Sequence, residues 1–229
     1  MIKVGLILGY GVSFGENKSD EPLLTLETPY GPVGGILKNT NYSDKEVYII
    51  KRHGEDEKTP SFKVNYKANI FALKELGCEY IVSTSLCGSL QEEICPGEFV
   101  VFDQFIDLST HRNLSFNDQF SHQELNLSAF NAPFSEAIRN CLIQAAIVKG
   151  ITIHTKSTVV SVDGPRQSTR AESNLFRSWG ADVVNTTTIP EAILAHELSL
   201  PYGAISLCTY YDTWRTDILP ATQTEKEEI

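Results

Sequence analysis

Short apolar runs alternate with longer helical patterns along this chain, and no other feature constrains the fold as strongly. The clearest helical patterns cover residues 65–76 and 135–148, and each is followed by a glycine, where a helix commonly ends in a left-handed turn. Apolar runs predict strands at residues 3–8, 46–50, 80–83, 98–102, 158–162, 182–184 and 204–207. This order predicts an α/β fold, with a mixed central β-sheet flanked by helices in a single domain over residues 1–229.

Two Thr-x-x-Glu sequences mark the starts of two further helices. Thr169 with Glu172, and Thr188 with Glu191, have the spacing of a capping box, in which a hydroxyl and a carboxylate accept hydrogen bonds from free N–H groups of the first turn. We therefore predict helices near residues 170–179 and 189–198. The first of them follows an apolar run and a Gly-Pro turn, which is typical of a strand-to-helix corner that binds a ligand.

Charge and cysteine content exclude several classes of function. The net charge of −10 opposes a nucleic-acid partner, because recognition of a phosphate backbone needs clustered Lys and Arg side chains. The five cysteines are odd in number and form no Cys-x-x-Cys pair, so neither a disulfide scaffold nor a zinc site is predicted. The apolar N-terminus is too short for a signal peptide or a membrane span. We expect a cytoplasmic protein with no membrane partner.

Polar residues follow several predicted strands, at the ends where open α/β sheets place their ligands. Arg52 supplies a planar fork that matches phosphate oxygens, and His53 adds a donor of adjustable charge. Gly9-Tyr10-Gly11 follows the first strand and suits a tight turn whose N–H groups could meet an anion. No helical pattern follows that turn, so a dinucleotide-binding site is rejected. Ser85 adds a hydroxyl after a third strand, and an anion site is predicted here.

Four segments carry a resemblance to a known family. They are Arg52-His53-Gly54, Cys87-Gly88-Ser89-Leu90, residues 185–191 (Asn-Thr-Thr-Thr-Ile-Pro-Glu) and Tyr211-Asp212. With them the chain resembles the purine nucleoside phosphorylase family, most closely its methylthioadenosine phosphorylase branch, over nearly its whole length. The resemblance implies phosphorolytic cleavage of the N-glycosidic bond of a purine nucleoside, or of a 5′-modified nucleoside such as methylthioadenosine. It also implies a homotrimer, inorganic phosphate as co-substrate, and neither a metal nor an organic cofactor.

The resemblance assigns the candidate site residues. The phosphate-binding set is Gly9, Tyr10, Gly11, Arg52, His53, Ser85 and Thr187. The nucleoside-binding set is Leu86, Gln167, Ser168, Asn185, Thr186, Tyr210 and Asp212. Asp212 is also the candidate catalytic residue, because cleavage leaves negative charge on the purine, which a carboxylic acid or its water can neutralise.

The chain departs from the family pattern at five of these positions. Tyr10, Leu86 and Thr186 stand where the family has Thr, Ala and Met, and Gln167 and Tyr210 replace a Phe and an Asp that face the base. The chain also ends sooner than family members do, so the helices with which they enclose the pocket are not expected. Two alternatives therefore stay open: a phosphate-independent nucleoside hydrolase, or a catalytically impaired or repurposed homologue that binds a nucleoside or supports a partner subunit.

Overall fold

The computed structural model describes residues 1–13, 23–42, 44–117 and 130–217. Its strands are β1 (Ile2–Leu8), β2 (Leu24–Leu26), β3 (Val33–Tyr42), β4 (Lys45–Lys51), β5 (Tyr80–Ser89), β6 (Phe99–Val101), β7 (Gln104–Asp107), β8 (Ile153–His154), β9 (Thr158–Ser161), β10 (Val183–Asn185) and β11 (Tyr202–Tyr211). Its helices are α1 (Tyr66–Glu75), α2 (Glu136–Lys149), α3 (Arg170–Ser178) and α4 (Thr188–Glu197), with a 3-10 turn at Ser61–Lys63.

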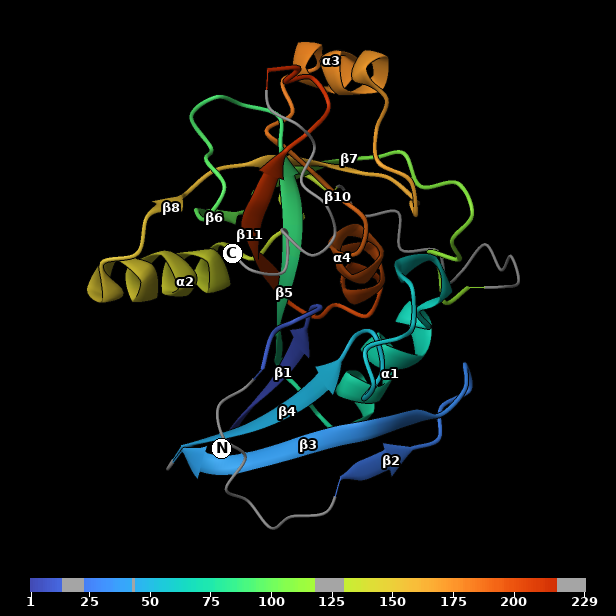
Figure 1. Ribbon diagram of the computed structural model, residues 1–229. Coiled ribbons are helices and arrows are strands. Elements are labelled where there is room, and N and C mark those ends of the chain that lie inside the picture. The colour runs from blue at the N-terminus through green and yellow to red at the C-terminus, as the bar shows by residue number, and fades with distance from the viewer. Residues whose placement is uncertain (14–22, 43, 118–129, 218–229) are drawn as a thin grey trace.

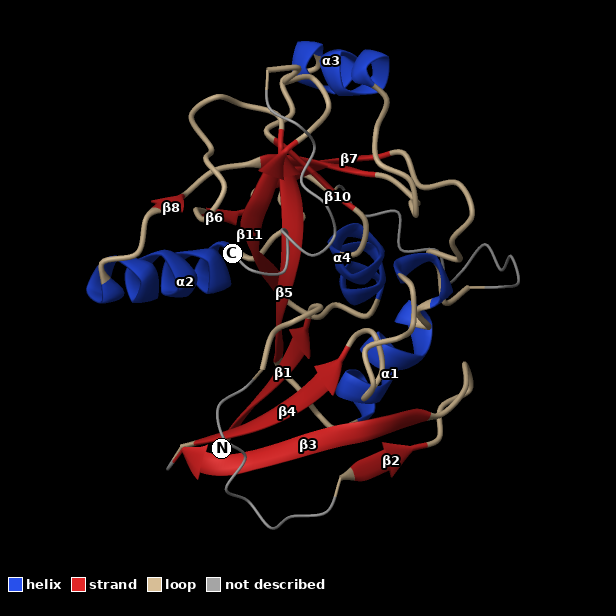
Figure 2. Cartoon of the chain, viewed as in Figure 1, coloured by secondary structure: helices blue, strands red, loops and turns tan. Residues whose placement is uncertain are grey.

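These strands form one mixed sheet in the order β2-β3-β4-β1-β5-β10-β9-β7, and a branch of β11, β6 and β8 leaves it at β5. Strand β5 runs parallel to β1 and β11 but antiparallel to β10. In the view of Figure 1, α1 and α4 lie on one side of β5 and β11, and α2 lies on the other. Figure 2 shows α3 beyond the upper end of the same strands. The predicted fold class is confirmed, and the single domain over residues 1–229 stays a prediction.

The core lies between the sheet and helices α1 and α4. Ile70 and Leu73 of α1 are fully buried in it, together with Ile7 of β1 and Ile81 of β5. The helix approaches β1 so closely that a Cβ on Gly5 would lie 2.7 Å from Leu73 Cδ1. This packing fixes the register of parallel strands β4, β1 and β5, whose carboxyl ends then meet at one edge of the sheet.

All four predicted helices and all seven predicted strands are present, but the prediction omitted β2, β3, β7 and β8. Strand β3 escapes a search for apolar runs because it opens with Val-Gly-Gly and continues into polar residues. Strands β5 and β11 also extend beyond the predicted 80–83 and 204–207, since they pair with each other through their polar ends. Their register shifts between Cys208 and Tyr210, which places an extra residue in β11.

One of the two predicted capping boxes is wrong. At α3 the Thr169 hydroxyl accepts from the Glu172 N–H and the Glu172 side chain accepts from the Thr169 N–H, as predicted. At α4, however, the N-cap is Thr187, and the Asn185 Oδ1 atom accepts the N–H groups of Thr187 and Thr188 at 2.8 and 3.0 Å. The Glu191 carboxylate is thereby left for a different role. None of the helices in the described residues is long and apolar enough to cross a membrane.

Candidate active site

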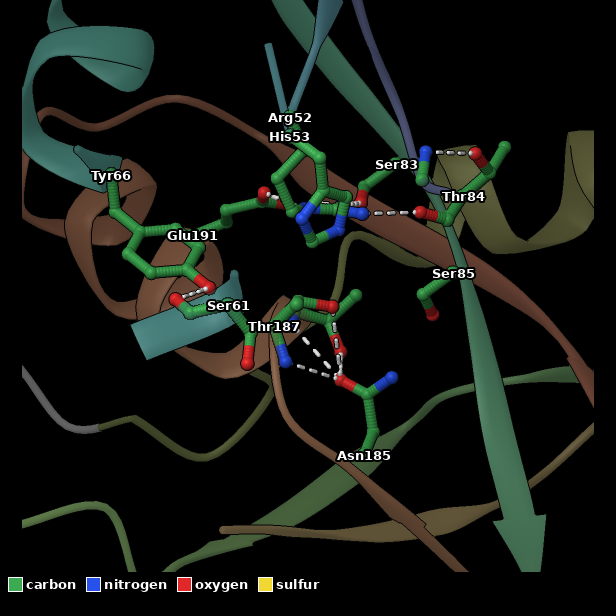
Figure 3. A network of polar contacts seen from close by, with 12 residues as sticks. Arg52, His53, Ser61, Tyr66, Ser83, Thr84, Ser85, Asn185, Thr187 and Glu191 are labelled. Atoms are coloured by element: carbon green, nitrogen blue, oxygen red, sulfur yellow. Dashed lines mark hydrogen bonds and ion pairs between the residues drawn. The ribbon is translucent and has the colours of Figure 1, made fainter. Parts of the chain in front are cut away.

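The shared edge of β4, β1 and β5 brings most of the predicted phosphate-binding residues together. A cavity of about 340 Å³, here called the first cavity, lies there; six of those residues line it: Gly9, Tyr10, Arg52, His53, Ser85 and Thr187. Figure 3 shows Arg52 and His53 entering from the end of β4, with Ser85 of β5 and Thr187 at the start of α4 nearby. Gly11 does not line the cavity.

Arg52 is 2% exposed and makes an ion pair that the sequence analysis missed. Its Nε and Nη2 atoms donate to the Glu191 carboxylate at 2.5 and 3.0 Å, and Nη1 donates to the Thr84 carbonyl at 2.8 Å. Glu191 also accepts from the hydroxyls of Ser83 and Tyr202 at 2.9 and 2.8 Å. Burial opposes the charge on Arg52, but Glu191 outweighs it and raises the pKa of the guanidinium above its ordinary value. Arg52 is therefore a fixed cation whose charge is balanced by the buried Glu191 carboxylate.

His53 presents a neutral imidazole to the first cavity. Its Nδ1 atom lies 2.8 Å from the Thr59 carbonyl oxygen, which only accepts, so Nδ1 carries the proton. Burial lowers the pKa of His53, which keeps the ring neutral at pH 7. The Tyr10 ring meets His53 edge-on with ring centroids 6.3 Å apart. The Nε2 lone pair is thus able to accept a hydrogen bond from a protonated phosphate or from water.

The turn after β1 places its N–H groups on the protein's own oxygen atoms. The Gly9 N–H donates to Thr84 Oγ1 at 2.9 Å, and the Gly11 N–H donates to Glu57 Oε2 at 3.1 Å. Glu57 lines the first cavity, and its Oε1 atom lies 3.3 Å from Lys51 Nζ. The turn meets an anion, as its sequence suggested, but here the anion is a side chain of the same molecule.

The two predicted phosphate-binding hydroxyls have partners within the protein. Ser85 Oγ donates to Ser206 Oγ on β11 at 3.0 Å. Thr187 Oγ1 lies 3.4 Å from Asn185 Oδ1, which is a long contact. Asn185 itself is largely occupied, because its Nδ2 group donates to the Leu86 carbonyl at 2.7 Å while Oδ1 caps α4. Asn185 therefore ties α4 to β5 at the cavity wall.

A second cavity of about 260 Å³ adjoins the first, and both are lined by Leu86, Pro165 and Thr186. Six of the predicted nucleoside-binding residues line it: Leu86, Gln167, Ser168, Asn185, Thr186 and Tyr210. Asp212 is 1% exposed and is not part of either cavity wall. The structure thus places all of the predicted nucleoside-binding residues around the second cavity except Asp212, the candidate acid.

The second cavity is lined by apolar side chains and by neutral hydrogen-bonding residues, together with Arg166, which pairs with Glu172. The Tyr210 ring covers Gly88, where a Cβ would lie 2.6 Å from the ring, and burial raises the pKa of the phenol above its ordinary value. The hydroxyls of Ser168 and Thr209 are buried and have no hydrogen-bond partner among the described residues. Thr209 was not among the predicted residues, although its position directly before Tyr210 at a strand end could have signalled it. Both residues line the cavity, but their hydroxyl oxygens are buried beneath its surface and are left unpaired.

Comparison with known proteins decides the family. The model of the phosphorylase superfamily matches residues 3–227. The chain belongs to the phosphorylase superfamily. It is 42% identical to the S-methyl-5′-thioadenosine phosphorylase of Ciona intestinalis, over 94% of this chain and 78% of that protein, and 41% identical to the enzyme of Drosophila melanogaster, over 93% and 75%.

A solved structure supports the same assignment of this phosphorylase superfamily member. The methylthioadenosine phosphorylase of Schistosoma mansoni in complex with adenine superposes with a TM-score of 0.90 at 32% identity, covering 100% of this chain and 85% of that one. The predicted family and its methylthioadenosine phosphorylase branch are confirmed. Within the described residues, no group of three or more His, Cys, Asp or Glu side chains is placed to hold a metal ion.

Proposed function

We propose that this chain is a pentosyltransferase of purine salvage that cleaves the N-glycosidic bond of a purine nucleoside, or of a 5′-modified nucleoside such as methylthioadenosine, by phosphorolysis. The observation that carries the proposal is the pair of adjoining cavities that meet at Leu86 and Thr186. The first contains a fixed guanidinium at Arg52 and a neutral imidazole at His53, and the second offers hydroxyl and amide groups. The similar proteins and the similar solved structure, which are named as methylthioadenosine phosphorylases, support the proposal.

In this reaction inorganic phosphate binds in the first cavity, the pentose at the junction and the base in the second cavity. A phosphate oxygen forms the bond to the anomeric carbon as the bond to the base nitrogen breaks, which yields the pentose 1-phosphate. Arg52 and the Thr187 hydroxyl hold the phosphate, while His53 Nε2 accepts its proton in a hydrogen bond. Positioning and preorganised charge supply most of the rate, because no covalent intermediate with the protein is required.

The departing base takes up negative charge and needs a proton or hydrogen-bond donors. Ser168, Thr209 and Tyr210 line the second cavity and carry hydroxyl groups, which are the donors that we propose for this role. We keep Asp212 as the proposed acid. Because it is buried outside both cavity walls, the proton reaches the base through an intervening group. Gln167 supplies an amide in place of a stacking ring, which favours in-plane hydrogen bonding over packing on the base.

The deciding experiment is a chromatographic screen of methylthioadenosine, adenosine, inosine and guanosine, each with and without phosphate. Free base that forms only with phosphate supports phosphorolysis. Equal base release without phosphate contradicts it and identifies a hydrolase. The replacements at Tyr210 and Gln167 favour a second candidate, a nucleoside-binding homologue without turnover, which predicts a rise in Tm with a nucleoside but no free base.

We further propose that the protein acts in the cytoplasm as a homotrimer whose neighbouring subunits complete each pocket. The assembly is what the family resemblance of the sequence implies, and the location follows from the five cysteines without a predicted disulfide scaffold. Light scattering tests the assembly: we expect a mass of about three times the 25.5 kDa of one chain. A stable species of one chain's mass contradicts it.

A further inference from the structure

Glu57 lies in the first cavity at a place set by an unusual backbone. Its φ angle is 56°, which is the left-handed region that favours glycine, so a strained residue carries this side chain. The loop containing it follows β4, and the Glu57 N–H donates to the Gly54 carbonyl at 3.2 Å. The side chain is only 26% exposed. The local structure therefore directs the carboxylate back toward the turn after β1.

The carboxylate makes two contacts that an inorganic anion would also make. Its Oε2 atom accepts the Gly11 N–H at 3.1 Å, and its Oε1 atom lies 3.3 Å from Lys51 Nζ. Backbone N–H groups of a glycine turn and a nearby ammonium are the usual elements of an anion site. The Gly9 N–H is also used, by Thr84 Oγ1. The turn thus meets an incoming phosphate with two of its N–H groups already bonded.

The cations that line the first cavity are not paired with this carboxylate, whose ammonium partner, Lys51, is 43% exposed and lies outside the cavity wall. The Arg52 guanidinium is paired with the buried Glu191 carboxylate, and burial lowers the pKa of His53 and keeps it neutral at pH 7. Lys58 lines the cavity, but its side chain is 81% exposed and pairs with Asp56. An anion that enters the first cavity therefore meets a like charge that only the partly exposed Lys51 screens.

We propose that Glu57 is an internal anion of the first cavity: its carboxylate occupies the position at the glycine turn that phosphate would take, and it sets how well phosphate competes with water as the nucleophile. This inference rests on the proposed function, because it takes the first cavity to be the phosphate site. Glu57 is a specificity-determining residue in this account. It weakens phosphate binding without contributing to bond cleavage.

The test is Glu57→Gln, which removes the charge but keeps an oxygen that can accept the Gly11 N–H. The dissociation constant for inorganic phosphate is measured from Tm as a function of phosphate concentration, at constant ionic strength maintained with sodium chloride. We expect the variant to bind phosphate about tenfold more tightly than the unaltered protein, because one like charge in partial contact with the ligand is removed. The ratio of phosphorolysis to hydrolysis rises by a similar factor.

Two further variants separate this role from general effects. Glu57→Gly removes the carboxylate and suits the left-handed backbone, so it folds even where Gln in that conformation does not; it is expected to tighten phosphate binding as well. The matched control is Asp44→Asn, which removes a carboxylate charge from a side chain that is 67% exposed and does not line the cavity. Its dissociation constant stays within about twofold of the unaltered protein, since exposed charges are screened.

The outcomes distinguish this inference from the proposed function. If Glu57→Gln and Glu57→Gly bind phosphate no more tightly than Asp44→Asn, the inference is overturned, even where base release requires phosphate. If both Glu57 variants bind phosphate more tightly while no nucleoside yields free base, the inference stands and the proposed function fails. If phosphate raises the Tm of none of the proteins, the first cavity is not a phosphate site, and the inference is overturned with it.

Discussion

The walls of the two adjoining cavities differ in how their polar groups are satisfied. In the first cavity, Arg52, the Gly9 N–H group and the Ser85 hydroxyl are all bonded to other parts of the protein. In the second cavity, the hydroxyls of Ser168 and Thr209 are buried with no partner among the described residues. A ligand in the first cavity must add to, or displace, bonds that exist, whereas these two hydroxyls of the second cavity have no bond to displace. The polar groups of the first wall are therefore held in place by bonds within the protein, whereas two hydroxyls of the second wall are not.

The largest effect that tests this difference is expected from Glu191→Ala. The substitution leaves the Arg52 guanidinium buried without its carboxylate, so we expect the free energy of unfolding to fall by about 3–5 kcal/mol. Chemical denaturation measures it. The control Asp217→Asn breaks an exposed pair with Arg215 and is expected to leave the midpoint unchanged. Equal midpoints for the two variants would show that the first wall does not depend on the buried pair.

A smaller effect is expected at Asp163, which lies two residues before Pro165, a residue that lines both cavities. Burial raises its pKa, but hydrogen bonds from Thr110, His111 and Arg112 outweigh burial and lower the pKa to about 2. Because the folded-state pKa lies below the unfolded value, the stabilisation is present above about pH 4 and is lost as the pH falls toward 2. Asp163→Asn should cost about 1 kcal/mol at pH 7 and flatten the acid limb of the stability curve.

Denaturation midpoints between pH 7 and pH 2 check the Asp163 prediction. Asp44→Asn, on an exposed side chain paired with its neighbour Lys45, is the control. If the stability curve of Asp163→Asn runs parallel to that of the unaltered protein down to pH 2, ionised Asp163 does not stabilise the fold.

The smallest effect compares one hydroxyl from each wall. Ser85→Ala breaks the bond to Ser206 and should lower the free energy of unfolding by about 1 kcal/mol. Thr209→Val removes a hydroxyl that has no bonded partner among the described residues, so stability should hold or rise slightly, while the dissociation constant for a nucleoside rises about fivefold. Calorimetry of both variants measures the stabilities. A Thr209→Val variant that loses as much stability as Ser85→Ala would erase the difference between the walls.

The sequence predicted that Arg52, His53 and Gly9 lie together, because the carboxyl ends of the neighbouring parallel strands β4 and β1 meet at one edge. Thr187 was assigned only through the family resemblance, since it follows β10, which is antiparallel to β5. The sequence did not predict that Glu191 pairs with Arg52. Thr188-x-x-Glu191 has the spacing of a capping box, and its actual partner is 139 residues away in the chain. Tertiary pairing overrode the local pattern.

Glu57 illustrates the same limit in a loop. No local pattern predicts that its side chain reaches a turn 46 residues earlier, since that contact depends on how the loop after β4 folds over β1. Strand β3 was missed for the opposite reason. Its glycines and polar residues conceal a strand that is specified by pairing with β4 rather than by its own apolar content.

Because β11 contains an extra residue, two successive residues, Thr209 and Tyr210, face the same cavity. In regular strands adjacent residues face opposite ways, yet both line the second cavity. Deleting a single residue at this point would restore the alternation and turn one of the two away from the base. Loss of three nucleotides from the gene would therefore change which ligand the second cavity prefers, without a substitution at the residue that stays in contact with the ligand.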